Sequence, residues 1–370
     1  MPEWAWWVLP TLYCGYIAAH GVGLWQLRRR QVVPTPTPVL PSLSLIVPVR
    51  NEGAHLRAHA ERWLGQVYPE FTVTVVDDHS SDGAAAGLPP DARLRVLALP
   101  HDRVGKKAAL AHGIAHTHGA WVVTTDGDCY PLNTDWLGTL AGGMCPETVC
   151  LVGPLRKRHR GNLFEAAQAL ESVGLVGLAA GAIGLGAPTL ANGANLAFRR
   201  TAFDQVAGYA GIDHLASGDD ELLVHKLAGA FGGRAVRFVF HPQAIVETPA
   251  EQSLPALVRQ RLRWVSKGRA YRNPFMRLGQ VVAYLAYAVL LLYTLRVAWA
   301  PETWPWALGL WALKLLTELS VLYPTARLLG QRYLLWWLPL YQLPYLVYVL
   351  YIGVAGSFTR SYDWKDRRVQ

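Results

Sequence analysis

Two acidic residues stand at a spacing that suits metal chemistry. Asp126 and Asp128 are separated by one glycine and follow the apolar run Trp121–Val123, which predicts a strand that directs both carboxylates past its end. Hard divalent ions such as Mg²⁺ bind one or two carboxylates together with the phosphate oxygens of a substrate. An ion held here would stabilise a diphosphate leaving group as its negative charge develops. A polar turn that merely follows a strand is the alternative interpretation.

Polar segments also close two other apolar runs and open one helix. Pro48–Glu52 (PVRNE) ends the first run, and Val75–Gly83 (VVDDHSSDG) ends the second. Gly105–Leu110 (GKKAAL) opens a helix whose backbone N–H groups and lysine charge can meet an anion. Asp78 can accept hydrogen bonds from a uracil ring or a ribose, whereas capping of the following turn by Asp77 and Asp78 is the alternative.

The elements that precede these segments must bring them together. From Ser42 to about Glu247, short β-rich runs alternate with helix-like stretches, which predicts parallel βαβ units and an α/β fold. In such a sheet, ligands bind beyond the carboxyl ends of the strands, where the acidic residues lie. The predicted strands are Leu43–Val49, Phe71–Asp77, Leu94–Leu99 and Trp121–Asp126, and the predicted helices include Gly53–Gln66 and Lys106–His118.

The composition indicates that part of the chain faces lipid. Of the 370 residues, 52% are apolar and only 16% are charged, whereas an average soluble domain has about 25% charged residues. Residues Trp4–Leu27 contain no Asp, Glu, Lys or Arg and are long enough to cross a bilayer core of about 30 Å. Arg28, Arg29 and Arg30 follow at once, which predicts an uncleaved anchor over residues 1–30 with its arginine end inside the cell. A cleaved signal peptide is the alternative, but its basic residues would precede the apolar run.

Four further regions follow this anchor. Alternating prolines in residues 31–41 predict a stiff linker. Residues 42–250 are expected to form the α/β domain, residues 251–277 an amphipathic interface helix, and residues 278–370 a membrane region with a basic tail. Trp and Tyr crowd the ends of the candidate spans, as they do at membrane interfaces. These spans are Leu278–Arg296, Trp304–Tyr323 and Tyr333–Gly353.

Some apolar segments carry features that oppose a simple crossing. Lys314 and Glu318 are four residues apart in the second candidate span, so they can pair within one helix. Pro339 and Pro344 interrupt the third span, which is therefore expected to re-enter or to lie in the interface. The apolar segment Leu175–Ala187 is too short to span a bilayer and is expected to shape the entry of an acceptor.

The formal charge of +9 suits either a nucleic acid or an anionic membrane. The basic residues gather near the membrane segments, and the sequence has no RNA- or DNA-binding motif. We therefore expect a membrane partner and no nucleic-acid partner. The four cysteines form no CxxC pair, so a disulfide framework is not expected.

The ordered set of motifs resembles glycosyltransferase family 2, which has the GT-A fold. The resemblance rests first on PVRNE, VVDDHSSDG, GKKAAL and TDGDC, in that order. Ala191–Arg199 (ANGANLAFR) resembles the acceptor-side loop of the family, and Ser217–Leu223 (SGDDELL) resembles its catalytic acidic motif. Gln260–Trp264 (QRLRW) matches the Q(Q/R)xRW motif of the membrane-bound branch. Over about residues 42 to 270, the resemblance implies a GT-A catalytic domain, mostly parallel in its sheet, with transmembrane and interfacial helices.

The resemblance also implies an inverting transfer, in which a carboxylate removes the proton of an acceptor hydroxyl. Asp220 is the expected base, with Asp219 beside it where the family has glutamate; Asp219 could instead cap a helix that starts near Asp220. The expected donor-binding residues are Pro48, Arg50, Glu52, Asp78, Lys106, Asp126, Gln260, Arg263 and Trp264. The expected acceptor loop holds Asn192, Gly193 and Asn195, and the expected metal ligands are Asp126, Asp128 and His241, although a histidine in the position of His241 is more often structural.

The helix predicted over Ser253–Lys267 carries two patterns at once. Arg259, Arg263 and Lys267 recur at i,i+4 spacing on one side. A membrane-surface helix has the same pattern, and both interpretations hold if the apolar stripe lies in the interface while Arg263 turns to the site. The apolar stripe consists of Leu254, Leu257, Val258, Leu262 and Val265.

These features predict a membrane enzyme that requires Mg²⁺ or Mn²⁺. The expected donor is a UDP-sugar carrying glucose, and the expected acceptor is the hydroxyl or carboxyl of a lipid-like molecule at the cytosolic face of the plasma membrane. A processive polysaccharide synthase is one alternative. Such an enzyme needs a tunnel that conducts the polymer chain, and the few short candidate spans of this sequence look too small to form one. A non-catalytic membrane protein that binds nucleotide sugars is the other, and it would not need every acidic position to be filled.

Overall fold

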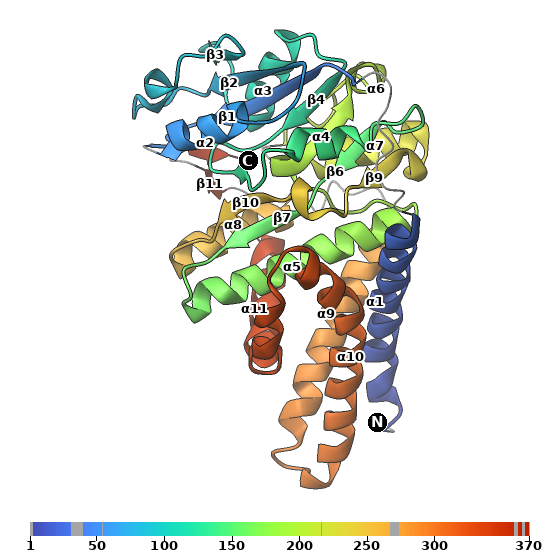
Figure 1. The fold of residues 1–370 in the computed structure, drawn as a ribbon. Helices are drawn as coiled ribbons and strands as arrows, with labels where there is room; N and C mark the ends of the chain where they lie inside the picture. Colours follow the sequence, from blue (N-terminus) through green and yellow to red (C-terminus); the bar gives the residue numbers. More distant parts are fainter. Residues whose placement is uncertain are drawn as a thin grey trace.

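In the computed structural model, an α/β domain rests on a group of long helices (Figure 1). The structure describes residues 3–30, 40–53, 55–215, 217–266, 274–358, 362–364 and 367–369. Most of the expected proline-rich linker lies outside these residues.

The α/β domain is built around a seven-stranded sheet with the order β3-β2-β1-β4-β8-β6-β9. Strands β3, β2, β1 and β4 are parallel, and β8 is antiparallel to both of its neighbours. The chain moves outward from β1 to β3 and then returns to the other side of β1 at β4, which makes the β1–β4 boundary a switch point where ligands bind in open α/β sheets. The strands are β1 (Leu43–Val49), β2 (Phe71–Asp77), β3 (Leu94–Ala98), β4 (Trp121–Thr124), β6 (Cys150–Val152), β8 (Leu196–Arg199) and β9 (Val236–Phe238).

Burial explains why the central strands read as continuous apolar runs. Every residue of β1 and β4 is buried, as expected for parallel strands covered on both faces. The predicted bounds of β1 and β2 agree with the structure, and the predicted mostly parallel α/β fold is confirmed. The helices of the domain are α2 (His55–Leu64), α3 (Lys106–Ala115), α4 (Trp136–Ala141), α6 (Arg200–Gln205) and α7 (Glu221–Phe231).

A second, three-stranded sheet joins distant parts of the chain beneath the first. Strand β10 (Val246–Pro249) pairs antiparallel with β5 (Tyr130–Pro131) and parallel with β7 (Leu155–Arg158). The buried Glu247 carboxylate accepts a hydrogen bond of 2.5 Å from Tyr130 Oη and another of 2.6 Å from Arg156 Nε. This sheet therefore holds the segment after Asp128 next to the segment that leads into helix α8 (Leu254–Ser266).

Helix α5 (Leu163–Gly184) lies between the α/β domain and the other long helices (Figure 1). The expectation that its apolar part is too short to span a bilayer was wrong, because the helix has 22 residues and is long and apolar enough to do so. It continues toward its N-terminus through Gln168 and Glu171 because their polar groups bond to Glu251 and Arg261 instead of to water. In this fold, 67% of the residues in an 18-residue apolar window of the helix are buried inside the protein.

The remaining long helices form the lower part of the molecule. They are α1 (Ala5–Arg30), α9 (Pro274–Arg296), α10 (Trp304–Leu328) and α11 (Leu338–Phe358), with the 3₁₀ segment Arg332–Trp337 before α11. Besides α5, the ranges Met276–Arg296, Pro301–Leu328 and Arg332–Gly356 are long and apolar enough to cross a membrane. The 26-residue α1 is not among these four ranges, so its role as an anchor stays a prediction.

The polar pair expected inside one long helix is confirmed. Lys314 Nζ lies 2.7 Å from Glu318 Oε1 on α10. The Glu318 carboxylate also accepts hydrogen bonds from Tyr13 Oη at 2.6 Å and from Gln342 Nε2 at 3.0 Å. These bonds connect α1, α10 and α11. They also satisfy the Glu318 carboxylate, whose charge would be costly if it were unpaired in an apolar surrounding.

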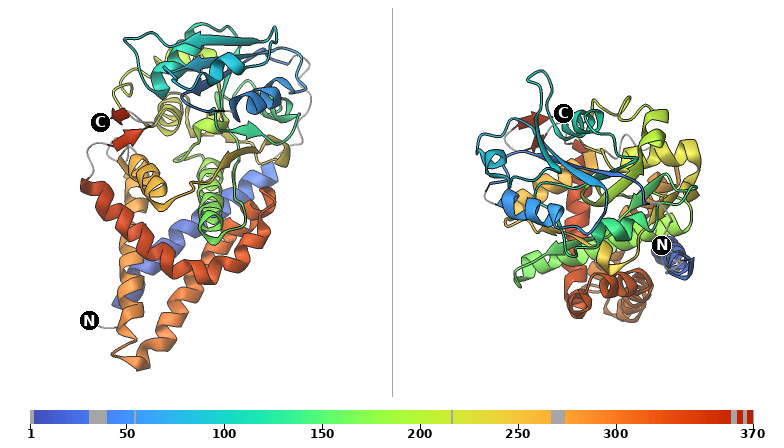
Figure 2. Two further views of the ribbon diagram at one scale, coloured as in Figure 1. Left: turned by 90° about the vertical axis from the view of Figure 1, so that its left-hand side faces the viewer. Right: turned by 45° about the horizontal axis from the view of Figure 1, so that its top comes forward.

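Helix α11 does not run alongside its two predecessors. It crosses obliquely beneath the α/β domain and contacts α8 and α9 (Figure 2). Pro339 lies in its first turn, where a missing N–H is tolerated, whereas Pro344 lies inside the helix. The chain then ends in two short paired strands, β11 (Tyr362–Trp364) and β12 (Arg367–Val369), on the side of the α/β domain, whereas the N-terminus lies at the far end of α1 (Figures 1 and 2).

The contact between α1 and α5 predicts how a single methyl group affects stability. A Cβ atom at Gly184 would lie 2.0 Å from the carbonyl oxygen of Gly23, so the two helices would have to separate. We expect Gly184→Ala to destabilise the protein by about 1–3 kcal/mol, as overpacking typically does. Thermal unfolding in detergent, followed by circular dichroism, measures this effect.

Gly15→Ala is the matched control, because a Cβ at Gly15 on α1 meets no atom of the described residues within 4 Å. Gly15 lies inside α1, where alanine has the higher helix propensity, so the control is expected to keep or raise the melting temperature. Equal melting temperatures for the two variants would contradict the close packing of α1 on α5.

Candidate active site

A cavity of about 290 Å³ opens at the carboxyl ends of β1, β2 and β4, and is called the cleft below. Its size is close to the lower limit of ordinary small-molecule sites, which begin at about 300 Å³. Of the nine expected donor-binding residues, all of which are described, eight line it and Trp264 does not. The lining residues are Pro48, Val49, Arg50, Glu52, Asp78, Lys106, Asp126, Gly127, Asp128, Glu251, Ala256, Arg259, Gln260 and Arg263.

The ends of β1 and β2 are joined by a bond between side chain and backbone. Arg50 Nη1 donates to the carbonyl oxygens of Asp78 and His79, at 2.7 Å and 3.0 Å. The Asp78 side chain is 1% exposed and accepts a hydrogen bond of 3.0 Å from the backbone N–H of Gly105. Asp77 instead accepts from the N–H of Ser80, so the turn-capping alternative describes Asp77 and not Asp78.

Lys106 lies between the two acidic motifs. Its Nζ is 2.7 Å from Asp126 Oδ1 and 3.0 Å from Asp219 Oδ2. Burial alone would lower the pKa of this ammonium, but the charges of Asp126, Asp219 and Asp220 outweigh burial and hold the pKa well above its ordinary value. Lys106 therefore stays charged and holds a carboxylate from each motif beside the cleft.

The residues after β4 fit a hard divalent cation. Among the residues that the structure describes, Asp126, Asp128 and Cys129 bring potential ligand atoms within 4.8 Å of one another. Burial, together with the two carboxylates, raises the pKa of the Cys129 thiol well above its ordinary value, and its Sγ donates to Asp128 Oδ1 at 3.0 Å. The thiol therefore stays protonated, which leaves carboxylate oxygens as the ligands and favours Mg²⁺ or Mn²⁺ over a thiophilic metal.

The structure does not bring His241 into this group of described residues. His241 precedes the 3₁₀ segment Pro242–Ala244, and its Nδ1 accepts a hydrogen bond of 3.3 Å from the N–H of Gln243. This contact is the structural role that the sequence left open for His241.

The expected acceptor loop contacts the second acidic motif through its backbone. The N–H of Gly193 donates to Asp220 Oδ2 at 3.1 Å, and its carbonyl accepts from Thr124 Oγ1 at 2.7 Å. Asn192 caps the short 3₁₀ turn by accepting from the N–H of Ala194. Asn195 is completely buried and donates to two backbone carbonyls at 2.8 Å, so it holds the loop and cannot touch a ligand.

The two acidic residues at 219 and 220 occupy different positions. Asp220 is the N-cap of α7, and its Oδ1 accepts from the N–H of Glu221 at 2.7 Å. Asp219 is buried and forms the ion pair with Lys106. The helix cap therefore falls on Asp220, whereas the sequence had suggested Asp219 as the capping alternative.

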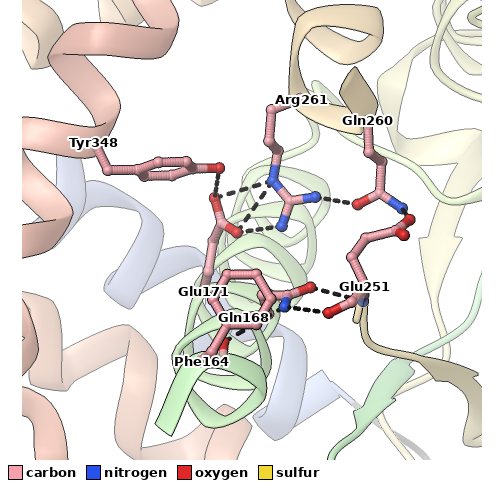
Figure 3. A network of polar contacts seen from close by, with 7 residues as sticks. All are labelled: Phe164, Gln168, Glu171, Glu251, Gln260, Arg261 and Tyr348. Atoms are coloured by element: carbon pink, nitrogen blue, oxygen red, sulfur yellow. Dashed lines mark hydrogen bonds and ion pairs between the residues drawn. The ribbon is translucent and has the colours of Figure 1, made fainter. Parts of the chain in front are cut away.

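Helix α8 presents one face to the cleft and another to α5 and α11. Ala256, Arg259, Gln260 and Arg263 follow the i, i+3, i+4, i+7 spacing of one helical face, and all four line the cleft. Arg261 points away from the cleft, toward Glu171 of α5 (Figure 3), and its Nε donates to Glu171 Oε2 at 3.1 Å.

Trp264 lies on the side of Arg261, with its ring centroid 4.2 Å from the guanidinium carbon. This geometry is a cation–π contact that holds the guanidinium in place. Trp264 therefore packs on Arg261 and does not line the cleft, which differs from the position expected for a donor-binding residue.

Glu251 lines the cleft but carries no sequence signal. Its backbone N–H and carbonyl are both paired with the amide of Gln168, each at 2.9 Å, and its carboxylate accepts from Gln260 Nε2 at 2.6 Å (Figure 3). Glu251 follows a strand without a motif, and its backbone partner Gln168 lies 83 residues away in the chain. Sequence spacing alone therefore gave no reason to select it.

Comparison with known proteins places these residues in a family context. Residues 44–207 match the family described as glycosyl transferase family 2. Glycosyltransferase AglE of Haloferax volcanii is 32% identical over 123 residues, which cover 32% of this chain and 40% of that protein. The chain thus spans well under half the length of this relative. The family match includes the cleft segments up to β8 and ends before Asp219, Asp220 and α8.

The fold is also similar to solved structures. A mannosyltransferase from Pyrobaculum calidifontis, described in complex with GDP-Man and Mn²⁺, aligns with 95% of this chain and 100% of its own, with a TM-score of 0.55 at 21% identity. A glucosyl-3-phosphoglycerate synthase from Mycobacterium tuberculosis aligns with 61% of this chain and 78% of its own, with a TM-score of 0.41 at 17% identity. The expected GT-A-like fold is confirmed.

The position of Asp126 predicts a pH dependence of cation binding. Burial is the main cause that raises the pKa of Asp126, and the charge of Asp128 acts in the same direction, while Lys106 opposes them. A carboxylate with a raised pKa is protonated at a higher pH than usual, so protons begin to compete with a bound cation at a higher pH. We expect Mn²⁺ binding, measured by electron paramagnetic resonance, to weaken as the pH falls from neutral into the mildly acidic range.

Asp128→Ala tests the same site and should weaken Mn²⁺ binding by about tenfold or more, since it removes one of two carboxylates. His241→Ala is the companion variant, and unchanged affinity would remove His241 from the set of ligands. Mn²⁺ affinity that did not depend on pH or on Asp128 would contradict the assigned site.

Proposed function

We propose that this protein is an inverting glycosyltransferase that moves a sugar from a nucleoside diphosphate to a lipid-like acceptor at the membrane surface. The observation that carries the proposal is the cleft itself. It brings Asp78, the Asp126–Asp128 pair, Lys106 and the basic face of α8 to one edge of the sheet. The match of residues 44–207 to glycosyl transferase family 2 supports it.

The donor is proposed to lie along the cleft with its base near β2 and its diphosphate near β4. The buried Asp78 can accept hydrogen bonds from the base or ribose. Asp126 and Asp128 would hold a divalent ion, which neutralises the diphosphate when bound. Arg259 and Arg263 on α8 lie where they can contact the phosphates. The proposed donor is a UDP-sugar with glucose; the Pyrobaculum mannosyltransferase was solved with GDP-Man, so both donors need testing.

The acidic pair is proposed to supply the base for the acceptor hydroxyl. In an inverting transfer the oxygen of the acceptor bonds to the anomeric carbon while the bond to the diphosphate breaks, and the hydroxyl proton passes to a carboxylate. Asp220 is the proposed base, and its position at the N-cap of α7 favours the ionised form. Asp219 remains the alternative because Lys106 pairs with both Asp219 and Asp126, so Asp219 lies near the proposed metal ligands.

The membrane arrangement is part of the proposal. The four apolar ranges support membrane association, and the three arginines at the end of α1 support an orientation with the catalytic domain on the cytosolic side of the plasma membrane. In this arrangement residues 1–30 anchor the chain, residues 31–41 link the anchor to the domain of residues 42–250, residues 251–277 lie at the interface, and residues 278–370 return to the membrane.

A donor-consumption assay tests the proposed activity directly. The full-length protein in detergent should release UDP from UDP-glucose, or GDP from GDP-mannose, in the presence of Mn²⁺ and total lipid from the source cells. Chelation or Asp128→Ala should abolish the release of UDP or GDP, because no metal ion then stabilises the negative charge that develops on the leaving diphosphate. Full activity in excess chelator would refute metal dependence.

Mass spectrometry of lipids from cells with and without the protein then identifies the product. A lipid carrying one sugar supports the proposal, whereas a polymer would favour a processive synthase. Donor binding without any product would favour a non-catalytic nucleotide-sugar-binding protein.

The assignment of the base is tested by two neighbouring substitutions. Asp220→Asn should lower turnover by about 10²–10⁴-fold, the usual contribution of a positioned base, while nucleotide-sugar affinity stays near normal. Asparagine is also a good N-cap, so the variant should keep the start of α7. Asp219→Asn should lower turnover less.

Turnover in both variants, with nucleotide-sugar affinity measured alongside, separates the possible outcomes. If Asp219→Asn is inactive and Asp220→Asn retains activity, the base is Asp219. If both variants retain turnover, neither residue is the base.

A further inference from the structure

A second cavity lies among the long helices, away from the cleft. It is partly open, has a volume of about 100 Å³, and is bounded by α1, α5, α9, α10 and α11. Leu170 and Leu178 of α5 and Val321 of α10 contribute aliphatic walls, and tyrosine rings from α9 and α11 complete the lining. The helices around it include the ranges apolar enough to cross a membrane.

The cavity depends on one glycine of α5. Gly177, Gly181 and Gly184 allow α10 and α1 to approach closely, since a Cβ at each would lie within 2.6 Å of a neighbouring atom. Gly174 is different, because the nearest described atom to its Cβ would be Leu322 Cδ2 at 3.6 Å. Gly174 therefore leaves space where the other three glycines allow contact.

The charged groups in the wall are already satisfied. The Glu318 carboxylate receives hydrogen bonds from Tyr13, Lys314 and Gln342, at 2.6 Å, 2.7 Å and 3.0 Å. Because Lys314 balances the charge of Glu318, this part of the wall offers neither an unpaired cation for a phosphate nor an unpaired anion for an amine. The lining therefore suits an uncharged hydrocarbon.

A chain of three polar side chains connects this cavity to the cleft, and Figure 3 shows these side chains. Glu171 lines the cavity and accepts from Arg261 Nε at 3.1 Å. Arg261 also donates to Gln260 Oε1, and Gln260 lines the cleft, where it donates to Glu251. The network Glu171–Arg261–Gln260 is therefore a polar partition with the donor side on one face and an apolar cavity on the other.

We infer that the cavity binds the hydrocarbon of the acceptor next to its reacting end, and that the acceptor is an uncharged long-chain alcohol or a lipid with a free hydroxyl. The inference rests on the proposed function, because it assigns the second substrate of the same reaction. Apolar walls hold the chain through the hydrophobic effect, while the polar partition lies where a hydroxyl must leave the cavity. The space beside Gly174 then sets how bulky the chain can be.

A photoreactive probe tests this assignment without knowledge of the natural acceptor. The full-length protein in detergent is irradiated with hexadecanol that carries a diazirine within its chain, and labelled peptides are identified by mass spectrometry. In the wild-type protein, labelling should concentrate on α5 and α11 residues of the cavity. Gly174→Leu should reduce that labelling by about tenfold or more, since a few methylene groups in an apolar pocket have effects of this size.

Gly15→Leu is the matched control, because it adds the same side chain to a helix at a position where an added Cβ meets no described atom within 4 Å. It should leave the labelling unchanged. Labelling that spreads over the outer surfaces of the helices, or that is equal in Gly174→Leu and Gly15→Leu, would overturn the inference.

Gly174→Cys provides a second measurement that does not require a bulky side chain to fold. Its thiol should react with N-ethylmaleimide, and hexadecanol should slow the reaction; no protection would also overturn the inference. Nucleotide-sugar binding is measured for every variant. If the protein binds nucleotide sugar but hexadecanol does not protect the thiol, only the assignment of the acceptor site is wrong. If the wild-type protein binds no nucleotide sugar, the proposed function itself is refuted.

Discussion

The ion pairs of Lys106 are the constraint on which the arrangement of the cleft depends. A buried carboxylate is costly unless a cation or several donors compensate it. Lys106 compensates two, Asp126 at 2.7 Å and Asp219 at 3.0 Å, which come from segments far apart in the chain. Its position is fixed in turn by Gly105, whose φ of 95° starts α3 and whose N–H donates to Asp78. The end of β2 at Asp78, the pair Asp126–Asp128 and the pair Asp219–Asp220 are thus held in one frame.

The close approach of the loop at position 193 belongs to the same frame. A Cβ at Gly193 would lie 2.8 Å from Asp219 Oδ2 and 3.0 Å from Lys106 Nζ. Glycine therefore lets the loop approach the ion pair without displacing the ends of these two side chains, and its N–H reaches Asp220. Both acidic residues are thereby fixed by the same loop, through close packing at Asp219 and a hydrogen bond at Asp220.

The sequence predicted this part of the molecule well because the signals were local. Fully buried parallel strands appear as continuous apolar runs, so the bounds of β1 and β2 agree with their predictions. Motifs at the strand ends likewise identified most of the cleft lining. Contacts between distant segments were not predictable in the same way. Glu251, the direction of Trp264 and the full length of α5 all depend on partners from other elements, and spacing within one segment does not reveal them.

The short motif QRLRW on helix α8 contributes side chains both to the cleft and to the opposite side of the helix. In QRLRW, Gln260 and Arg263 are three residues apart and share the cleft face, whereas Arg261 and Trp264 share the opposite side. The Arg261–Glu171 pair is buried, and the cost of removing both charges from water offsets much of the attraction between them. The pair connects the side of α8 that faces away from the cleft to α5. A change at Glu171 would therefore act on the cleft through Arg261 and α8, since Glu171 itself does not line the cleft.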